Sequence, residues 1–245
     1  MSLLESLKPT AKSILLPPYC RLRYGKLGGY FAQARLIPSW TTPKELLALA
    51  QVCQSLPDDA VIVEIGSFLG RAALFMGGTR KLIGSGKVHC VDPFDGSGED
   101  HSIPVFRRIA SQSKKSLRER FDDNMRRGGV EDWVEVHQGT AESIAKGWST
   151  PIDLLYMDAD QSPEGVRSAY SRWIPFLKPG GIIAAHNSAN RSYVEGDNDG
   201  HLRLVKESFQ APDYIDIYCV DSTTFARKVI DQSAYRSSVS LVAEG

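Results

Sequence analysis

Short apolar runs that alternate with helical segments constrain the fold of this chain more than any other feature. Five of these runs occupy residues 60–66, 87–92, 133–139, 152–160 and 178–187. Such runs are typical of strands that are buried on both faces of a parallel sheet. Two further runs, 214–220 and 223–229, are separated by two residues and predict a hairpin. The alternation predicts an α/β fold with a doubly wound, mostly parallel sheet.

The segments between these runs have the spacing and end signals of helices. The stretch 41–56 begins with threonine and proline, which favour a helix start, and continues with apolar residues at helical intervals. Helices are also predicted over 71–83, 101–127, 140–148, 162–177 and 201–209.

The two ends of the chain differ from this regular pattern. Residues 1–40 mix proline, glycine and aromatic side chains, which predicts an N-terminal arm or helical extension. Its aromatic residues are candidates to close over a pocket or to contact a second subunit. We expect one domain over 41–232 and a flexible tail over 233–245.

The composition excludes several classes of protein. Lys+Arg and Asp+Glu both number 29, and this balance argues against a nucleic-acid-binding protein, which normally has a basic excess. No apolar run is long enough to predict a membrane span, and no signal peptide is evident. The 4 cysteines form no paired motif, as expected of free thiols in a reducing compartment. We therefore expect a cytoplasmic protein that binds neither nucleic acid nor membrane.

A glycine-containing loop follows the first predicted strand, in the sequence VEIGSFLGR. Gly66 and Gly70 are spaced differently from a dinucleotide-binding fingerprint, and Glu64 adds a carboxylate that would repel a phosphate. Asp92, at the end of the second strand, is placed to accept hydrogen bonds from a ribose. Together these residues favour an adenosine ligand without a diphosphate. A tight strand-to-helix turn, with Asp92 as a cap, is the alternative.

These motifs, with YMDADQSPEGVRSAYSRWIPFLKPGGII further along, resemble those of class I methyltransferases that use S-adenosylmethionine. The resemblance covers roughly residues 41–230 and extends to bacterial O-methyltransferases of sugars and other natural products. It implies a Rossmann-like sheet of seven strands in the order 3-2-1-4-5-7-6, with the last hairpin antiparallel. It also implies a cofactor site formed by Glu64, Gly66, Ser67, Asp92, Gly139, Thr140, Ala141 and Asp158.

Polar residues end two strands that this order makes neighbours. Asp158 follows the fourth strand, and His186 and Asn187 follow the fifth, so we expect all three at the active edge. One hypothesis makes His186 the general base, with Asp158 and Asn187 orienting the acceptor. A second places a divalent metal on the same three residues, although metal-dependent relatives have a carboxylate where His186 stands. A structural role for the His-Asn pair is the third.

The sequence thus predicts an S-adenosylmethionine-dependent methyltransferase that acts on a hydroxyl of a small molecule, such as a sugar or secondary metabolite. Two alternatives remain at this point. One is an NAD-dependent oxidoreductase, which the G-x-x-x-G spacing disfavours, and the other is a cofactor-binding relative without activity. A homodimer is compatible with the sequence.

Overall fold

A seven-stranded sheet forms the centre of the computed structural model, which describes residues 9–230. The strand order is β3-β2-β1-β4-β5-β7-β6, and β7 runs antiparallel to both of its neighbours. This confirms the predicted fold class and strand order. The strands are β1 (Val61–Ile65), β2 (Lys87–Asp92), β3 (Val134–Gln138), β4 (Ile152–Met157), β5 (Leu177–Ala185), β6 (Tyr214–Val220) and β7 (Thr223–Lys228).

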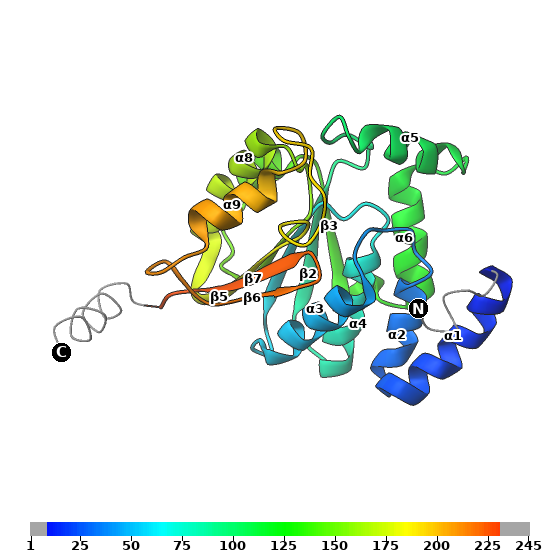
Figure 1. Ribbon diagram of the computed structural model, residues 1–245. Helices are drawn as coiled ribbons and strands as arrows, with labels where there is room; N and C mark the ends of the chain where they lie inside the picture. Colours follow the sequence, from blue (N-terminus) through cyan, green and yellow to red (C-terminus); the bar gives the residue numbers. More distant parts are fainter. Residues whose placement is uncertain (1–8, 231–245) are drawn as a thin grey trace.

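Helices cover both faces of the sheet, and α8 and α9 lie on the side opposite α3 and α4 (Figure 1). The helices are α1 (Pro9–Tyr24), α2 (Leu27–Ala34), α3 (Pro43–Ser55), α4 (Arg71–Ile83), α5 (Ile103–Ser111), α6 (Leu117–Gly128), α7 (Ala141–Ala145), α8 (Pro163–Trp173) and α9 (Gly200–Ser208). Short 3₁₀ turns at Glu131–Trp133 and Ile174–Phe176 lead into β3 and β5. None of the helices within 9–230 is long and apolar enough to cross a membrane.

The central strands supply side chains to two separate cores. On β4, Leu154 and Tyr156 pack toward α3 and α4, whereas Leu155 and Met157 pack toward α8 and α9. Every residue of β4 is buried, because successive side chains of a strand point to opposite faces and both faces are covered. Full burial of one such side chain contributes about 1.5–3 kcal/mol to folding. The uninterrupted apolar runs of the sequence follow from this arrangement.

The N-terminal segment is more helical than an irregular arm, because α1 and α2 together span most of residues 9–34. Phe31 is buried and its ring centroid lies 5.4 Å from that of Phe75 on α4. A Cβ atom at Gly78 would lie 2.4 Å from the Tyr30 ring, so a glycine there permits the close approach of α2 to α4. Tyr30 and Phe31 therefore pack on α4.

The predicted helix over 101–127 is instead two helices, α5 and α6, with a break at residues 112–116. Ser116 starts the second helix: its side chain accepts from the Glu119 amide, while the Glu119 carboxylate accepts from the Ser116 amide. This capping box competes with a continuous helix through the break. Gly129 ends α6 in the left-handed conformation, which glycine adopts without strain. The predicted tail 233–245 lies outside the described residues.

Candidate active site

A cavity of about 340 Å³ opens at the carboxyl ends of β1, β2 and β4, where ligands bind in sheets of this type. Most of the residues predicted to hold a cofactor line it together. They are Glu64, Gly66, Ser67, Asp92, Thr140, Ala141 and Asp158. Gly139 is not part of the wall, and its amide donates to the carbonyl oxygen of Asp92 at 3.1 Å.

The loop between β1 and α4 passes directly against the end of β4. Gly66 has a φ of +88°, and a Cβ atom there would lie 2.3 Å from the carbonyl oxygen of Asp158. Gly70 has a φ of +83° at the start of α4, and a Cβ atom there would collide with the Phe121 and Met125 side chains. Both glycines are therefore required by the backbone conformation and by close packing.

Asp92 holds this loop in place from the end of β2. One of its carboxylate oxygens accepts from the amides of Ser67 and Phe68, both at 2.8 Å. The other accepts from the amide of Phe94 at 2.6 Å. Burial raises the pKa of Asp92 in spite of these hydrogen bonds. Asp92 thus caps the strand-to-helix turn, as the alternative reading of the sequence predicted. It also lines the cavity, where the sequence predicts that it meets a ribose.

Glu64 is a buried acid in the wall of the cavity, with an exposed fraction of 2%. One of its oxygens accepts from the Ser67 hydroxyl at 2.7 Å and from the Cys90 thiol at 3.4 Å. Burial raises the pKa of Glu64 to about 8, because the charged form loses its hydration. Its carboxyl group is therefore mostly protonated at neutral pH until a cationic group approaches it.

His186 lies between two carboxylates behind the cavity wall. Its Nδ1 is 2.6 Å from Oδ1 of Asp158, and its Nε2 is 3.5 Å from Oε2 of Glu45. The first contact is a hydrogen bond, and the second is an ion-pair contact, since Nε2 has no hydrogen-bond partner. Burial opposes the charged ring, but the two carboxylates prevail and raise the pKa of His186 to about 9. The ring is thus an imidazolium at neutral pH.

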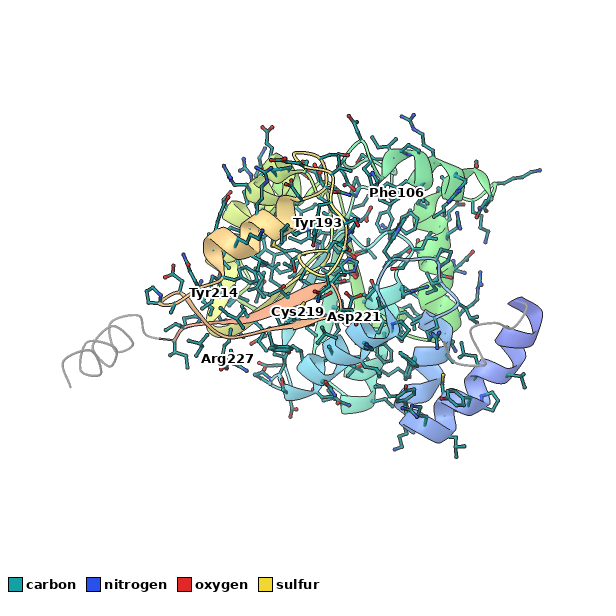
Figure 2. All side chains as sticks on the ribbon, in the orientation of Figure 1. Phe106, Tyr193, Tyr214, Cys219, Asp221 and Arg227 are labelled. Carbon is teal, nitrogen blue, oxygen red and sulfur yellow. The ribbon has the colours of Figure 1, made fainter. Side chains whose placement is uncertain are left out.

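Glu45 is fixed at the start of α3 by contacts with the β6–β7 turn. Its Oε1 accepts from the amide and hydroxyl of Ser222 and from the hydroxyl of Thr223. Its Oε2 accepts from the Thr42 amide, which completes the capping box of the helix. Burial opposes ionisation, but His186 and these donors lower the pKa of Glu45 to about 2. In Figure 2, Asp221 marks this turn, where it accepts from the Thr42 hydroxyl at 2.7 Å.

Comparison with known proteins identifies the family of the chain. A family model described as a methyltransferase domain matches residues 63–188. The chain belongs to this methyltransferase family. The match covers the glycine loop, Asp92, Asp158 and His186, and confirms the predicted class of enzyme, a class I methyltransferase that depends on S-adenosylmethionine.

Solved structures share the fold of this methyltransferase at low sequence identity. A protein of Corynebacterium glutamicum aligns with a TM-score of 0.61 and 12% identity, over 86% of this chain and 94% of that one. The O-methyltransferase NovP aligns with a TM-score of 0.59 and 16% identity, over 91% of this chain and 100% of its own. The SAH-bound methyltransferase PaMTH1 of Podospora anserina gives 0.58 and 16%, with 93% and 99% covered.

The predicted catalytic residues of the methyltransferase divide into two groups. Asp158 and Asn187 line the cavity, whereas His186, with an exposed fraction of 1%, does not. Asn187 adopts a φ of +54°, which turns the chain where β5 ends, and its Oδ1 accepts from the Ser222 hydroxyl at 3.4 Å. Asp158 therefore stands between His186 and any ligand in the cavity.

The same geometry bears on the predicted metal site. A metal at Asp158, His186 and Asn187 would have to displace the proton that Asp158 and Glu45 favour on His186. Without that ring, Asp158 and Asn187 supply few of the six or more oxygens that Mg²⁺ and Ca²⁺ prefer. The donor set thus fits Mg²⁺ and Ca²⁺ poorly.

Three aromatic residues that were not predicted from the sequence also line the cavity. Trp40 precedes α3, Phe68 lies in the glycine loop, and Phe106 lies on α5, in the upper part of Figure 2. Their ring centroids are 5.3–5.7 Å apart, so each ring contacts the other two. We call these three residues the aromatic cluster. No periodic pattern marks them in the sequence, because they come from three separate segments.

Arg71 lines the cavity and holds the segment before α3 in place by hydrogen bonds. Its guanidinium donates to the carbonyl oxygens of Ile37 at 2.7 Å and Thr41 at 2.8 Å. Burial lowers the pKa of Arg71 to about 10, so it remains charged at neutral pH. These bonds fix both ends of the short segment that presents Trp40, which is itself 47% exposed.

Proposed function

We propose that this methyltransferase transfers a methyl group from S-adenosylmethionine to a hydroxyl oxygen of a small molecule, with Asp158 as the group that accepts the proton. The observation that carries the proposal is the position of Asp158. It faces the cavity, and an imidazolium and a second carboxylate lie behind it. The similarity to NovP, an O-methyltransferase, is consistent with transfer to oxygen.

The residues that line the cavity fit the cofactor. Glu64 would meet the cationic methionine end, Asp92 the ribose, and Thr140 with Ala141 the adenine. When bound, S-adenosylmethionine supplies an electrophilic methyl group on a sulfonium. Because that group is a cation, it favours the ionised form of Glu64, whose proton the buried site otherwise retains.

Asp158 would orient the acceptor hydroxyl by accepting its hydrogen bond. As the new C–O bond forms and the C–S bond breaks, the hydroxyl proton becomes strongly acidic. A carboxylate is then a sufficient base, and the proton passes to Asp158. His186 is already protonated at neutral pH, so we assign it the positioning of Asp158 in place of the predicted role of base. The Tyr156 hydroxyl, 3.4 Å from Oδ2 of Asp158, holds the other oxygen.

The aromatic cluster indicates the chemical character of the part of the acceptor that adjoins its hydroxyl group. Three rings in mutual contact at a cavity wall favour a planar or apolar face on the acceptor. We therefore propose an aromatic or partly apolar secondary metabolite over a simple sugar. Asn187 would supply an amide for a second polar group.

Calorimetry followed by an activity assay tests this function. We expect S-adenosylhomocysteine to bind with one site per chain and NAD not to bind. We then expect methyl transfer from labelled S-adenosylmethionine to members of a panel of phenols, hydroxylated polyketides and sugars, unaffected by EDTA. Binding without transfer to any acceptor would favour the inactive relative, and complete inhibition by EDTA that Mg²⁺ or Mn²⁺ reverses would restore the metal hypothesis.

A further inference from the structure

Two histidines and a glutamate meet at the edge of the sheet, away from the residues that line the cavity. His89 lies on β2, and Glu135 and His137 lie on the edge strand β3. His89 pairs with Glu135 in the parallel register, and residues two apart on a strand point to the same face. The register therefore brings the three side chains to one face of the sheet.

The ligand atoms of these three residues are close to one another. Nδ1 of His89 lies 3.1 Å from Nε2 of His137. Oxygens of Glu135 lie 3.9 Å from the first nitrogen and 3.7 Å from the second. Among residues 9–230, this is the one set of three His, Cys, Asp or Glu side chains with ligand atoms all within 4.8 Å.

These separations match the coordination shell of a four-coordinate ion. Zinc bonds of about 2.0–2.1 Å to nitrogen and oxygen place tetrahedral ligands about 3.3 Å apart. The observed separations are 3.1 Å between the nitrogens and 3.9 and 3.7 Å to Oε2 and Oε1 of Glu135, so rotation of the Glu135 carboxylate can bring one oxygen near both nitrogens. Two imidazoles and a carboxylate are also a donor set that zinc and its neighbours in the transition series accept.

We propose that His89, Glu135 and His137 form a binding site for a divalent transition-metal ion, with Zn²⁺ as the expected occupant. The side chains are 15%, 48% and 24% exposed, so the ion can enter from solvent and keep a water molecule as a fourth ligand. Mg²⁺ and Ca²⁺ are excluded because they prefer oxygen ligands.

The surroundings orient the two rings. Trp148 contacts His89 and His137 with nearly perpendicular rings, at centroid distances of 5.1 and 5.4 Å. Trp148 in turn packs on the buried Trp173 of α8. The ion would join β3 to β2 just before Thr140, which lines the cavity. We therefore assign it a stabilising role for the edge strand.

Metal titration of the full chain, prepared without a histidine tag and stripped with EDTA, tests the site. We expect one Co²⁺ per chain, with the visible absorption of a four-coordinate ion, displacement by Zn²⁺, and quenching of Trp148 fluorescence by Cu²⁺. Loss of an outer-shell partner alone costs a metal site about 10–100-fold in affinity. His137→Gln and Glu135→Gln, which remove ligands, should lose at least that much.

His101→Gln is the matched control, since His101 is exposed and lies outside the cluster. It should bind Co²⁺ as the wild type does. Glu135 is the most exposed of the three, so Glu135→Gln keeps the test valid if a histidine variant fails to fold. The proposal is overturned if the wild type binds no Co²⁺ or Zn²⁺ below millimolar concentration. Equal affinity in all four proteins would also overturn it.

Discussion

His186, behind the cavity wall, and the two histidines at the sheet edge are both placed beside carboxylates, but the ratio of rings to carboxylates is reversed. One ring faces two carboxylates behind the cavity, and two rings share one carboxylate at the edge. At the cavity, His186 lies between Asp158 and Glu45 and is 1% exposed. At the edge, His89 and His137 share Glu135, which is 48% exposed. Two carboxylates around one buried ring stabilise its proton, whereas two rings beside one exposed carboxylate bring two ring nitrogens, hydrogen-bonded to each other at 3.1 Å, within reach of one ion.

The difference teaches that a histidine near a carboxylate is not by itself evidence for a base or for a ligand. The pKa of His186 rises to about 9 although burial opposes it, because two negative charges face the ring. Burial lowers the pKa of His89, where the single carboxylate does not overcome it. Experiments that change the number of carboxylates or the protonation state of each ring therefore test whether the two environments differ in this way.

The largest effect is expected from Asp158→Asn. The amide keeps the shape of the side chain but cannot accept the proton, and general bases contribute about 10²–10⁴-fold to rates. We expect kcat/KM to fall about 10³-fold in steady-state assays. Asp59→Asn, at an exposed position outside the site, is the control and should match the wild type. A decrease of less than about tenfold in Asp158→Asn would remove Asp158 from the proton-transfer step.

A second prediction concerns the stability that His186 contributes. Its folded pKa of about 9 lies above the unfolded value of about 6.5, so its contribution is complete below pH 6.5 and is lost as the pH rises through 9. The shift corresponds to about 3 kcal/mol of unfolding free energy. Urea unfolding at pH 6 and pH 10 measures it.

His186→Gln provides the comparison for that measurement. Glu64, whose pKa is about 8, lowers the stability of both proteins as the pH rises toward 8, so the difference between them reports on His186 together with its two carboxylate partners. The variant should be less stable by about 3–5 kcal/mol at pH 6, because removal of one partner leaves buried carboxylates unpaired. The difference should shrink at pH 10. A constant difference across this range would show that His186 is neutral in the folded protein.

A third prediction concerns the pH dependence of cofactor binding. Glu64 must ionise to meet a cationic group, and its pKa is about 8 in the free protein. We expect the affinity for S-adenosylhomocysteine, which retains the amino group, to rise up to about tenfold between pH 7 and pH 9. Calorimetry in buffers of different ionisation enthalpy should detect the released proton. Glu64→Gln should abolish the release, and an unchanged release in that variant would assign the proton to another group.

The smallest effect is expected in the aromatic cluster. Trp40→Ala removes two ring contacts, each worth at least about 0.5 kcal/mol, and should raise KM for the acceptor about fivefold. Affinity for S-adenosylhomocysteine should change little, as measured by calorimetry. Leu36→Ala, an exposed apolar residue of the same segment, is the matched control. A loss of affinity for S-adenosylhomocysteine without a change in KM for the acceptor would place Trp40 at the part of the cavity that binds the cofactor.

The sequence predicted much of the fold and part of the site, for physical reasons that differ between residues. The methyltransferase resemblance implied the strand order, and in that order the buried runs end at one edge of the sheet, which places Asp158 beside His186. The direction in which each side chain points does not follow, since Asp158 faces the cavity and His186 lies behind it. Glu45 was not predicted because its contact with His186 joins distant segments and leaves no local pattern.

The cluster of His89, Glu135 and His137 could not be predicted from the sequence for the same reason. His89 and His137 are each ordinary strand residues in the sequence, and only the parallel register of β2 and β3 brings them together. Trp40 and Phe106 likewise reach the cavity from segments on either side of the glycine loop. Residues within one motif were identified, whereas residues united by tertiary packing required the structure.

Nitrogen-15 NMR of the histidine side chains tests the central contrast most directly, with His186→Gln used to assign the resonances. The structure predicts that both nitrogens of His186 carry protons at pH 7, that the ring titrates near pH 9, and that added Zn²⁺ leaves it unchanged while shifting His89 and His137. A neutral His186 ring at pH 7, or a Zn²⁺-induced shift at His186 in place of the edge histidines, would contradict this account.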